Sequence, residues 1–216
     1  RRCLGQYQQA IDDLTLAITK DEDNVEFLFN RSQCYYDTQQ YAKAAEDLSL
    51  AMEKKGANDA RLQYHKGLAL YQQGLFEEAV ENLEGAVRDE LPKTSLPDCY
   101  YHIGLAYSYL EDHVKAAVAL TSAVSLRDAL PYVHERAKAL QMCGRYAEAI
   151  ADFNRVLAQK KGHANAHFRR GFAYKSLGRF EEAAEDFETA LRLAPDNPLL
   201  VINYNQIYGT ECIQLC

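Results

Sequence analysis

The sequence has few of the features that mark membrane proteins or nucleic-acid-binding proteins. Its apolar runs fall well short of the roughly 18 residues that a membrane-spanning helix needs, so no transmembrane segment is predicted. Basic residues are also scarce, because 24 Lys and Arg face 31 Asp and Glu, which gives a formal net charge of −7. A nucleic-acid backbone requires a basic stripe on its protein partner. We therefore expect neither membrane nor nucleic acid among the partners.

Motifs of catalysis and metal binding are absent as well. The chain has no GxSxG, HExxH, Walker or dinucleotide-binding motif. Its six cysteines show no paired spacing, and Cys212 and Cys216, four residues apart, would supply only two metal ligands. We expect a protein that is not an enzyme and that holds no cofactor and no metal ion. Scattered, unpaired cysteines are typical of a reducing compartment, which predicts a cytoplasmic location.

What the chain does have is an alanine that recurs about every 34 residues. The six copies are Ala10, Ala44, Ala79, Ala116, Ala149 and Ala183, which we call the alanine column. A period in this range indicates a stack of similar supersecondary units rather than one closed globule. Such a stack works mainly by displaying a long surface, so binding is the first function to consider.

Each copy of the alanine lies in the same local pattern. An aromatic residue usually precedes it by three, Leu or Phe follows it by four, and another small residue follows it by seven, as in Tyr7, Ala10, Leu14 and Ala17. Residues three or four apart share one stripe of a helix, so each copy predicts an amphipathic helix. A further small residue twelve before the alanine predicts that two antiparallel helices approach each other closely.

A glycine often stands five residues before the alanine, between two helical patterns. The glycines in this column are Gly5, Gly74, Gly144 and Gly178, with Gln39 and Glu111 at the other two positions. Short turns between helices need a residue that tolerates positive φ. The column therefore predicts a turn that joins two antiparallel helices.

These columns together resemble the tetratricopeptide repeat, and the resemblance extends over essentially the whole chain. This chain departs from the family's pattern in two ways: it has no Trp, and the proline near the end of a repeat occurs only once, as Pro195. The resemblance implies an all-α fold, an α-α superhelix (TPR solenoid) of antiparallel helix pairs.

Counting each repeat from the residue nineteen before its alanine predicts a single solenoid domain over 1–216. Residues 1–24 would form the second helix of a truncated repeat, and 198–216 the first helix of a further one. Five complete repeats lie between them, at 25–58, 60–93, 97–130, 130–163 and 164–197. We expect a fragment of a longer protein. Solenoids normally need polar end caps, so open ends would favour self-association.

In tetratricopeptide proteins, the side of each first helix that faces away from the core lines a concave groove that holds peptides. The resemblance therefore implies a peptide-binding groove made of repeat positions 2, 5, 6, 9, 12 and 13. The candidate groove residues are Phe29, Asn30, Tyr64, His65, Tyr71, Tyr101, His102, Tyr109, Lys138, Arg169 and Lys175.

Two features of these groove residues suggest what they would bind. A Tyr-His pair recurs in register at Tyr64-His65 and Tyr101-His102. Tyrosine combines apolar area with a hydrogen-bonding tip, which suits a binding face. Toward the C-terminal end the groove residues become basic, and they would hold an acidic side chain or a terminal carboxylate.

The family also has a carboxylate clamp for the C-terminus of Hsp70 or Hsp90, with Lys at position 5 and Asn at position 9. Here the fifth and ninth positions are occupied by other residue types, such as Tyr64 and Leu68, so binding of this kind is disfavoured.

We expect a noncatalytic scaffold or adaptor that binds a protein or peptide partner in the concave groove. The alternative is a substrate-selecting or regulatory arm of an enzyme whose catalytic domain lies outside this sequence. Binding on the convex face also stays open at this point.

Overall fold

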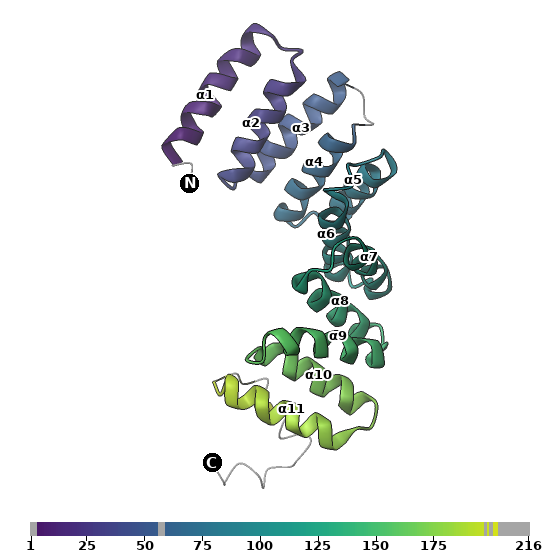
Figure 1. Cartoon of the computed structure of the whole chain (residues 1–216). Coiled ribbons are helices and arrows are strands. Elements are labelled where there is room, and N and C mark those ends of the chain that lie inside the picture. Colours follow the sequence, from purple (N-terminus) through teal and green to yellow (C-terminus); the bar gives the residue numbers. More distant parts are fainter. Residues whose placement is uncertain (1–3, 56–58, 197, 199–200, 203–216) are drawn as a thin grey trace. The chain divides into compact units, whose positions relative to one another are not determined.

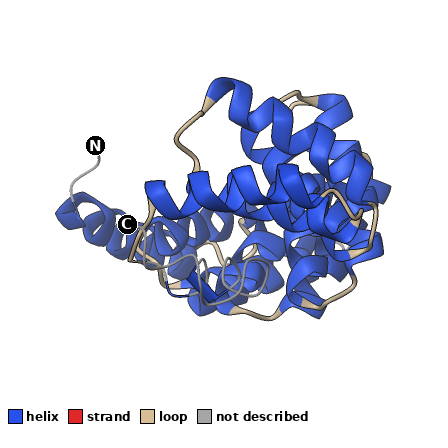
Figure 2. Ribbon diagram, turned by 90° about the horizontal axis from the view of Figure 1, so that it is seen from below, coloured by secondary structure: helices blue, strands red, loops and turns tan. Residues whose placement is uncertain are grey.

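A computed structural model describes residues 4–55, 59–196, 198, 201 and 202 of the chain. Throughout this part the secondary structure is helical, and no strand occurs in it (Figure 2). The predicted all-α class is therefore confirmed. Most of the first helix predicted for 198–216, together with Cys212 and Cys216, lies outside the described residues.

The chain divides into two compact units, residues 1–112 and 113–216. In the first unit, each helix packs against the next one along the chain, and α4 also contacts α6 (Figure 1). Its helices are α1 (Leu4–Lys20), α2 (Val25–Asp37), α3 (Tyr41–Lys55), α4 (Ala60–Gln73), α5 (Phe76–Arg88) and α6 (Leu96–Tyr109).

The second unit repeats this arrangement, with α8 in contact with α10 in addition to the sequential neighbours. Its helices are α7 (His113–Leu126), α8 (Leu130–Met142), α9 (Tyr146–Gln159), α10 (Ala164–Ser176) and α11 (Phe180–Leu193). Each predicted complete repeat contains one first helix (α2, α4, α6, α8 or α10) and one second helix. The single-domain organisation and the repeat boundaries stay predictions.

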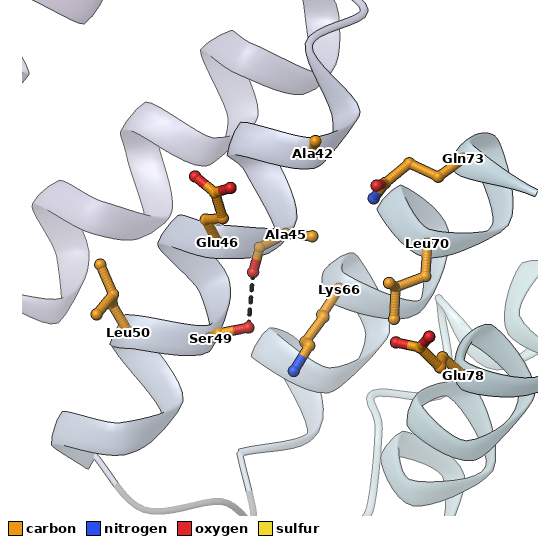
Figure 3. A pocket seen from close by; sticks show the side chains of 9 residues that line it. All are labelled: Ala42, Ala45, Glu46, Ser49, Leu50, Lys66, Leu70, Gln73 and Glu78. Carbon is orange, nitrogen blue, oxygen red and sulfur yellow. Dashed lines mark hydrogen bonds between the residues drawn. The ribbon is translucent and has the colours of Figure 1, made fainter. Parts of the chain in front are cut away.

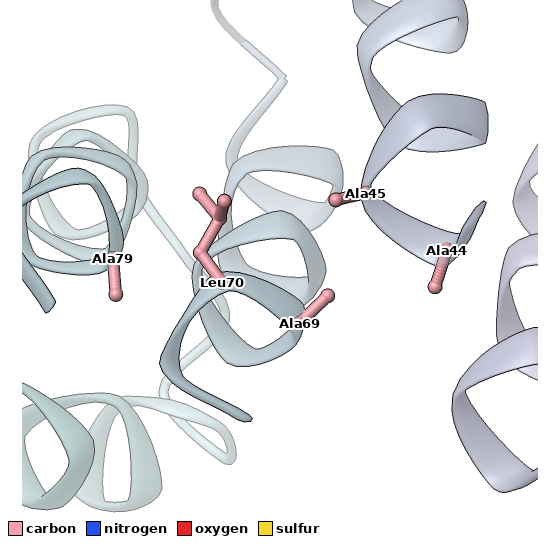
Figure 4. Close-up of a cluster of buried hydrophobic side chains, with 5 residues drawn as sticks. All are labelled: Ala44, Ala45, Ala69, Leu70 and Ala79. Atoms are coloured by element: carbon pink, nitrogen blue, oxygen red, sulfur yellow. The ribbon is translucent and has the colours of Figure 1, made fainter. Parts of the chain in front are cut away.

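The alanine column lies at the packing centre of the second helices. Ala44, Ala79, Ala116, Ala149 and Ala183 are all fully buried, whereas Ala10 on α1 is half-buried. Ala44 and Ala79 belong to one buried cluster, in which α3, α4 and α5 contribute four alanines and one leucine (Figure 4). Burial at every complete repeat explains why the alanines keep phase, because a larger side chain would overpack each site.

Glycine at the small column twelve residues before the alanine permits the close approach predicted from the sequence. A Cβ added to Gly67 of α4 would lie 2.6 Å from Cγ of Leu83 on α5. A Cβ on Gly171 of α10 would lie 3.1 Å from the carbonyl oxygen of Ala183 on α11. A side chain at either position would therefore crowd the partner helix, which would have to shift to accommodate it.

The turns between paired helices adopt the predicted left-handed conformation. Gly74, Gly144 and Gly178 have φ values of 81°, 80° and 73°, which confirms the turn at these three positions, whereas Gly5 of the same column lies within α1. Gln39 and Glu111, at the same column, also have positive φ, at 61° and 60°. The amide after each turn residue then donates to the carbonyl five residues earlier, as in the 3.1 Å bond from Leu75 to Leu70.

Sequence reasoning missed a recurring buried ion pair between the helices of three repeats. In each case, an arginine at repeat position 7 donates two hydrogen bonds to an aspartate sixteen residues later. The pairs are Arg31–Asp47, Arg136–Asp152 and Arg170–Asp186, with N–O distances of 2.6–2.8 Å. The aspartate side chains are only 4–5% exposed. Each bidentate pair joins a first helix to its own second helix.

Candidate functional site

The predicted groove residues lie on first helices in both units. In the first unit, α2 carries Phe29 and the exposed Asn30, and the other predicted residues lie on α4 and α6. The basic residues belong to α8 and α10 of the second unit. Because neighbouring first helices contact each other within each unit, they place these side chains in adjacent rows.

One set of rings joins α2 to α4. His65 lies edge-on to Phe29, with ring centroids 5.1 Å apart, and edge-on to Tyr64 at 5.2 Å. The guanidinium of Arg61 lies 4.2 Å from the centre of the Phe29 ring, a cation–π contact, and pairs with Glu26. The structure therefore brings together the groove residues predicted for the first two complete repeats.

A second set of rings joins α4 to α6. Tyr71 lies edge-on to His102 at 5.6 Å and to Tyr109 at 6.1 Å, while Tyr101 lies edge-on to His102 at 5.5 Å. Phe76, at the start of α5, stacks on Tyr109 with centroids 4.5 Å apart. We call the residues of both sets the ring ladder: Phe29, Tyr64, His65, Tyr71, Phe76, Tyr101, His102 and Tyr109.

Phe76 is the member of the ring ladder that the sequence analysis missed. It occupies the aromatic column three residues before the alanine, which we had assigned to helix packing alone. Tyr109, its stacking partner, is 63% exposed. The aromatic column therefore contributes to the accessible side of the first helices at this repeat.

Burial changes the protonation of the ladder histidines. Desolvation, together with repulsion from Arg61, lowers the pKa of His65 to about 4. Burial also lowers the pKa of His102, although its Nδ1 contacts the carbonyl oxygen of Asp98 at 2.7 Å. Both rings are therefore neutral at pH 7 and act as aromatic surface rather than as cations.

Acidification should destabilise the chain through His65. Its folded pKa lies below the unfolded value of about 6.5, so the unfolded chain binds more protons between these values. The contribution of neutral His65 to the free energy of unfolding is therefore fully present above about pH 6.5. It is lost as the pH falls toward 4, and the loss reaches up to about 3 kcal/mol. Urea midpoints at several pH values, compared with those of a His65→Gln variant, measure it. Equal pH dependence in both chains would contradict the assignment.

The second unit carries a cationic group of different character. The Arg169 guanidinium donates to Asn165 at 3.1 Å and to Gln141 at 3.4 Å, and both acceptors are neutral amide oxygens. Burial lowers the pKa of Arg169. Lys138, by contrast, pairs with Glu135 at 2.6 Å, so its charge is already matched within α8. Of the basic residues predicted for this unit, Arg169 therefore offers the better anion-binding group.

Apolar side chains flank this cationic group. On α10, Phe172 is 38% exposed, and Lys175 follows it by three residues. His134 on α8 stacks on His163 at 4.8 Å, and both Lys138 and Arg169 lie near enough to lower its pKa, after the larger effect of burial. The surface combines one desolvated guanidinium with aromatic rings, which suits an acidic group on an otherwise apolar segment.

The described residues show neither a metal-binding cluster nor a membrane-spanning helix. In the described part of the chain, no three His, Cys, Asp or Glu side chains gather closely enough to hold a metal ion. None of the described helices is long and apolar enough to cross a membrane.

Comparisons with known proteins agree with this architecture. Family models described as tetratricopeptide repeat match residues 4–60, 50–94, 97–129 and 164–197. A solved structure, that of YrrB, described as a TPR protein with an unusual peptide-binding site, superposes with a TM-score of 0.80. The two sequences are 24% identical, and the superposition covers 88% of this chain and 96% of the YrrB chain.

Curated relatives are longer than this chain. Tetratricopeptide repeat protein 13 of Homo sapiens is 31% identical over 104 residues, which are 48% of this chain and 12% of the relative. Peptidyl-prolyl cis-trans isomerase FKBP42 of Arabidopsis thaliana is 27% identical over 162 residues, which are 75% of this chain and 38% of the relative. The chain thus spans less than half the length of each. From the helix pairs, the buried columns and these matches, it follows that the chain belongs to the tetratricopeptide repeat family.

Proposed function

We propose that this chain is a noncatalytic scaffold that binds a segment of a partner polypeptide on the groove side of its first helices. The observation that carries the proposal is the ring ladder, which continues across α2, α4 and α6 through contacts between neighbouring helices. Aromatic side chains supply large contact areas at low entropic cost, and tyrosine adds a hydrogen bond. The description of YrrB as a peptide-binding TPR protein supports the same use of this fold.

The composition of the two units suggests how a segment would be recognised. The ring ladder offers apolar and aromatic contact area, so its ligand would be an apolar stretch of chain. Arg169 forms no ion pair among the described residues, although Glu135 lies near enough to act on its pKa, so it would pair with an acidic side chain or a terminal carboxylate. The ligand of the second unit would therefore carry negative charge.

The buried thiols support both the noncatalytic role and a cytoplasmic location. Cys99 is a free, buried thiol, and burial raises its pKa to about 12. A thiol with so high a pKa stays protonated, so it is a poor nucleophile. Free thiols fit a reducing compartment.

Replacing Tyr64, Tyr101 and Arg169 together with alanine should weaken partner capture at least tenfold, since truncation of tyrosine or arginine at an interface commonly costs more than about 1 kcal/mol. The partner would first be identified by pull-down with mass spectrometry, and its binding then measured with purified protein.

A matched control is the exchange of Val114, Val118 and Leu126 for alanine, because these α7 side chains are 50–65% exposed and lie on a second helix. This control should bind as the unchanged chain does. Melting temperatures of both variants should stay close to the original. Full binding by the groove variant would exclude the ring ladder and Arg169 as the contact surface.

A second candidate is an arm that selects substrates for an enzyme elsewhere in a longer protein. The observation that favours it is the isomerase relative, of which this chain spans only 38%. A catalytic signature in the sequence that flanks these residues would support the arm, and further repeats would support the scaffold. Self-association through the ends of the repeat stack stays a prediction, which light scattering at several concentrations tests.

A further inference from the structure

In two of the three buried arginine–aspartate pairs, the arginine also donates a hydrogen bond to the preceding second helix. Besides its aspartate, Arg31 donates to Oγ1 of Thr15 on α1 at 3.0 Å, and Arg170 donates to Oδ1 of Asn154 on α9 at 2.6 Å. Thr15 and Asn154 occupy the same column, five residues after the alanine. The guanidinium therefore bridges its own second helix and the preceding one, and it fills the space between them.

The repeat at 60–93 departs from this pattern at both positions. Lys66 stands where the arginine stands elsewhere, and Asn82 replaces the aspartate. The Asn82 amide donates to the carbonyl oxygen of Glu78 in its own helix at 2.8 Å, so it does not reach across to α4. Among the described residues, the half-buried Lys66 forms no hydrogen bond and no ion pair.

A concavity of about 560 Å³ opens at this place, between α3 and α4 and beside the start of α5. Its apolar wall consists of alanine and leucine side chains, and Glu46 and Glu78 lie on either side of Lys66 (Figure 3). We call this concavity the Lys66 pocket; its lining residues are Ala42, Ala45, Glu46, Ser49, Leu50, Lys66, Leu70, Gln73 and Glu78.

The Lys66 pocket is separate from the ring ladder. At about 100° per residue, Lys66 and Leu70 lie on the side of α4 opposite Tyr64 and Tyr71. A segment bound to the groove side would therefore leave this pocket accessible.

Comparison with the other repeats shows which group the pocket lacks. Ser49 on α3 occupies the column of Thr15 and Asn154, so the acceptor from the preceding second helix is retained. The missing component is the carboxylate that Asp47, or its equivalent, supplies elsewhere. The half-buried Lys66 ammonium is only partly hydrated, so a carboxylate from outside the chain would stabilise it more strongly than it would a fully exposed lysine.

We propose that the Lys66 pocket is a second docking site, which takes an acidic side chain of a partner polypeptide in place of the missing aspartate. The pocket's three ionised groups sum to −1, from one lysine and two glutamates, so polyanions such as nucleic acids are disfavoured. The partner segment carries basic side chains beside its acidic one, and these face Glu46 and Glu78. Its aliphatic portions contact Ala42, Ala45 and Leu70.

The probe for this site is a set of synthetic helical peptides. Each contains one glutamate with an arginine before and after it, at spacings from two to five residues, and each has a counterpart with glutamine in place of glutamate. Binding is followed by NMR through the ¹³C-methylated lysine side chains of the chain, and by fluorescence anisotropy. Disappearance of one lysine signal in Lys66→Gln assigns Lys66.

We expect at least one glutamate peptide to shift the Lys66 signal and to bind at least about tenfold more tightly than its glutamine counterpart, as a charge-assisted hydrogen bond implies. The double variant Lys66→Arg with Asn82→Asp restores the internal pair, so it should lose this preference and unfold at higher urea concentration. Lys66→Gln should lose the preference as well. The Tyr64, Tyr101 and Arg169 triple variant should keep it.

The proposal is overturned if no peptide of the set shifts the Lys66 signal, or if glutamate and glutamine peptides bind equally. It is also overturned if the double variant retains the preference. These outcomes leave the proposed groove function untouched, because that function is measured with a different variant and on the opposite side of α4.

Discussion

Replacing Phe153 with alanine should lower the free energy of unfolding by about 3–5 kcal/mol, the usual cost of removing a fully buried aromatic side chain. Phe153 on α9 is 0% exposed, and the ring of His134 on α8 lies edge-on to it at 6.1 Å. Truncation would remove this ring contact with α8 and leave a cavity. The shift of the urea midpoint, followed by circular dichroism, measures the effect.

Phe172→Ala is the matched control for this change. Phe172 lies on α10 and is 38% exposed, so its truncation should cost less than about 2 kcal/mol. The two variants therefore separate packing from surface exposure. A Phe153→Ala variant as stable as Phe172→Ala would show that α8 and α9 do not pack around this ring.

Asp186→Ala should destabilise the chain by about 2–4 kcal/mol. Asp186 is 3% exposed and accepts hydrogen bonds from Arg170 at 2.6 and 2.7 Å, and it contacts Nδ1 of His167 at 2.8 Å. Without it, a guanidinium with only 20% exposure would lose its counter-charge, which is costly in a partly buried site. The estimate lies below that for a fully buried pair because the arginine retains some solvent.

Glu182→Ala provides the comparison on the same helix. Glu182 pairs with Arg179, but both side chains are more than 40% exposed, so solvent screens the pair and its loss should change the stability very little. Urea midpoints of the two variants measure the difference. A loss of similar size for both would mean that the Arg170–Asp186 pair is no more important than a surface pair.

Much of the fold could be predicted because the sequence repeats the same small residues at the same positions. The alanine column is buried, and Gly74, Gly144 and Gly178 adopt positive φ, as the period indicated. Burial between helices and positive φ both restrict which residue types fit, so the same residues recur at these positions and can be recognised in the sequence.

The buried ion pairs are harder to predict from the sequence, and the sequence analysis did not identify them. Arginine and aspartate sixteen residues apart recur in three of the five complete repeats, yet charged residues are common on exposed helices. Whether such a pair is buried depends on the packing between neighbouring repeats. The Lys66 pocket could not be predicted for the same reason. It is recognised only by comparing the repeat at 60–93 with the repeats that contain the ion pair.

For the candidate site, the sequence indicated the columns but not the contacts. The ring ladder contains every aromatic groove residue that was predicted, because helix periodicity determines which side of a first helix each occupies. Glu135 pairs with Lys138, and Arg169 forms no ion pair among the described residues. Both depend on side-chain conformations that no spacing predicts.

Site-specific photo-crosslinking tests the central proposal most directly. A photoreactive phenylalanine analogue is introduced in place of Tyr101 on α6, or in place of Val118 on α7, and the chain is irradiated with its purified partner. We predict cross-links from position 101 that map to one segment of the partner, and none from position 118. Cross-links from position 118 alone would contradict binding on the groove side of the first helices.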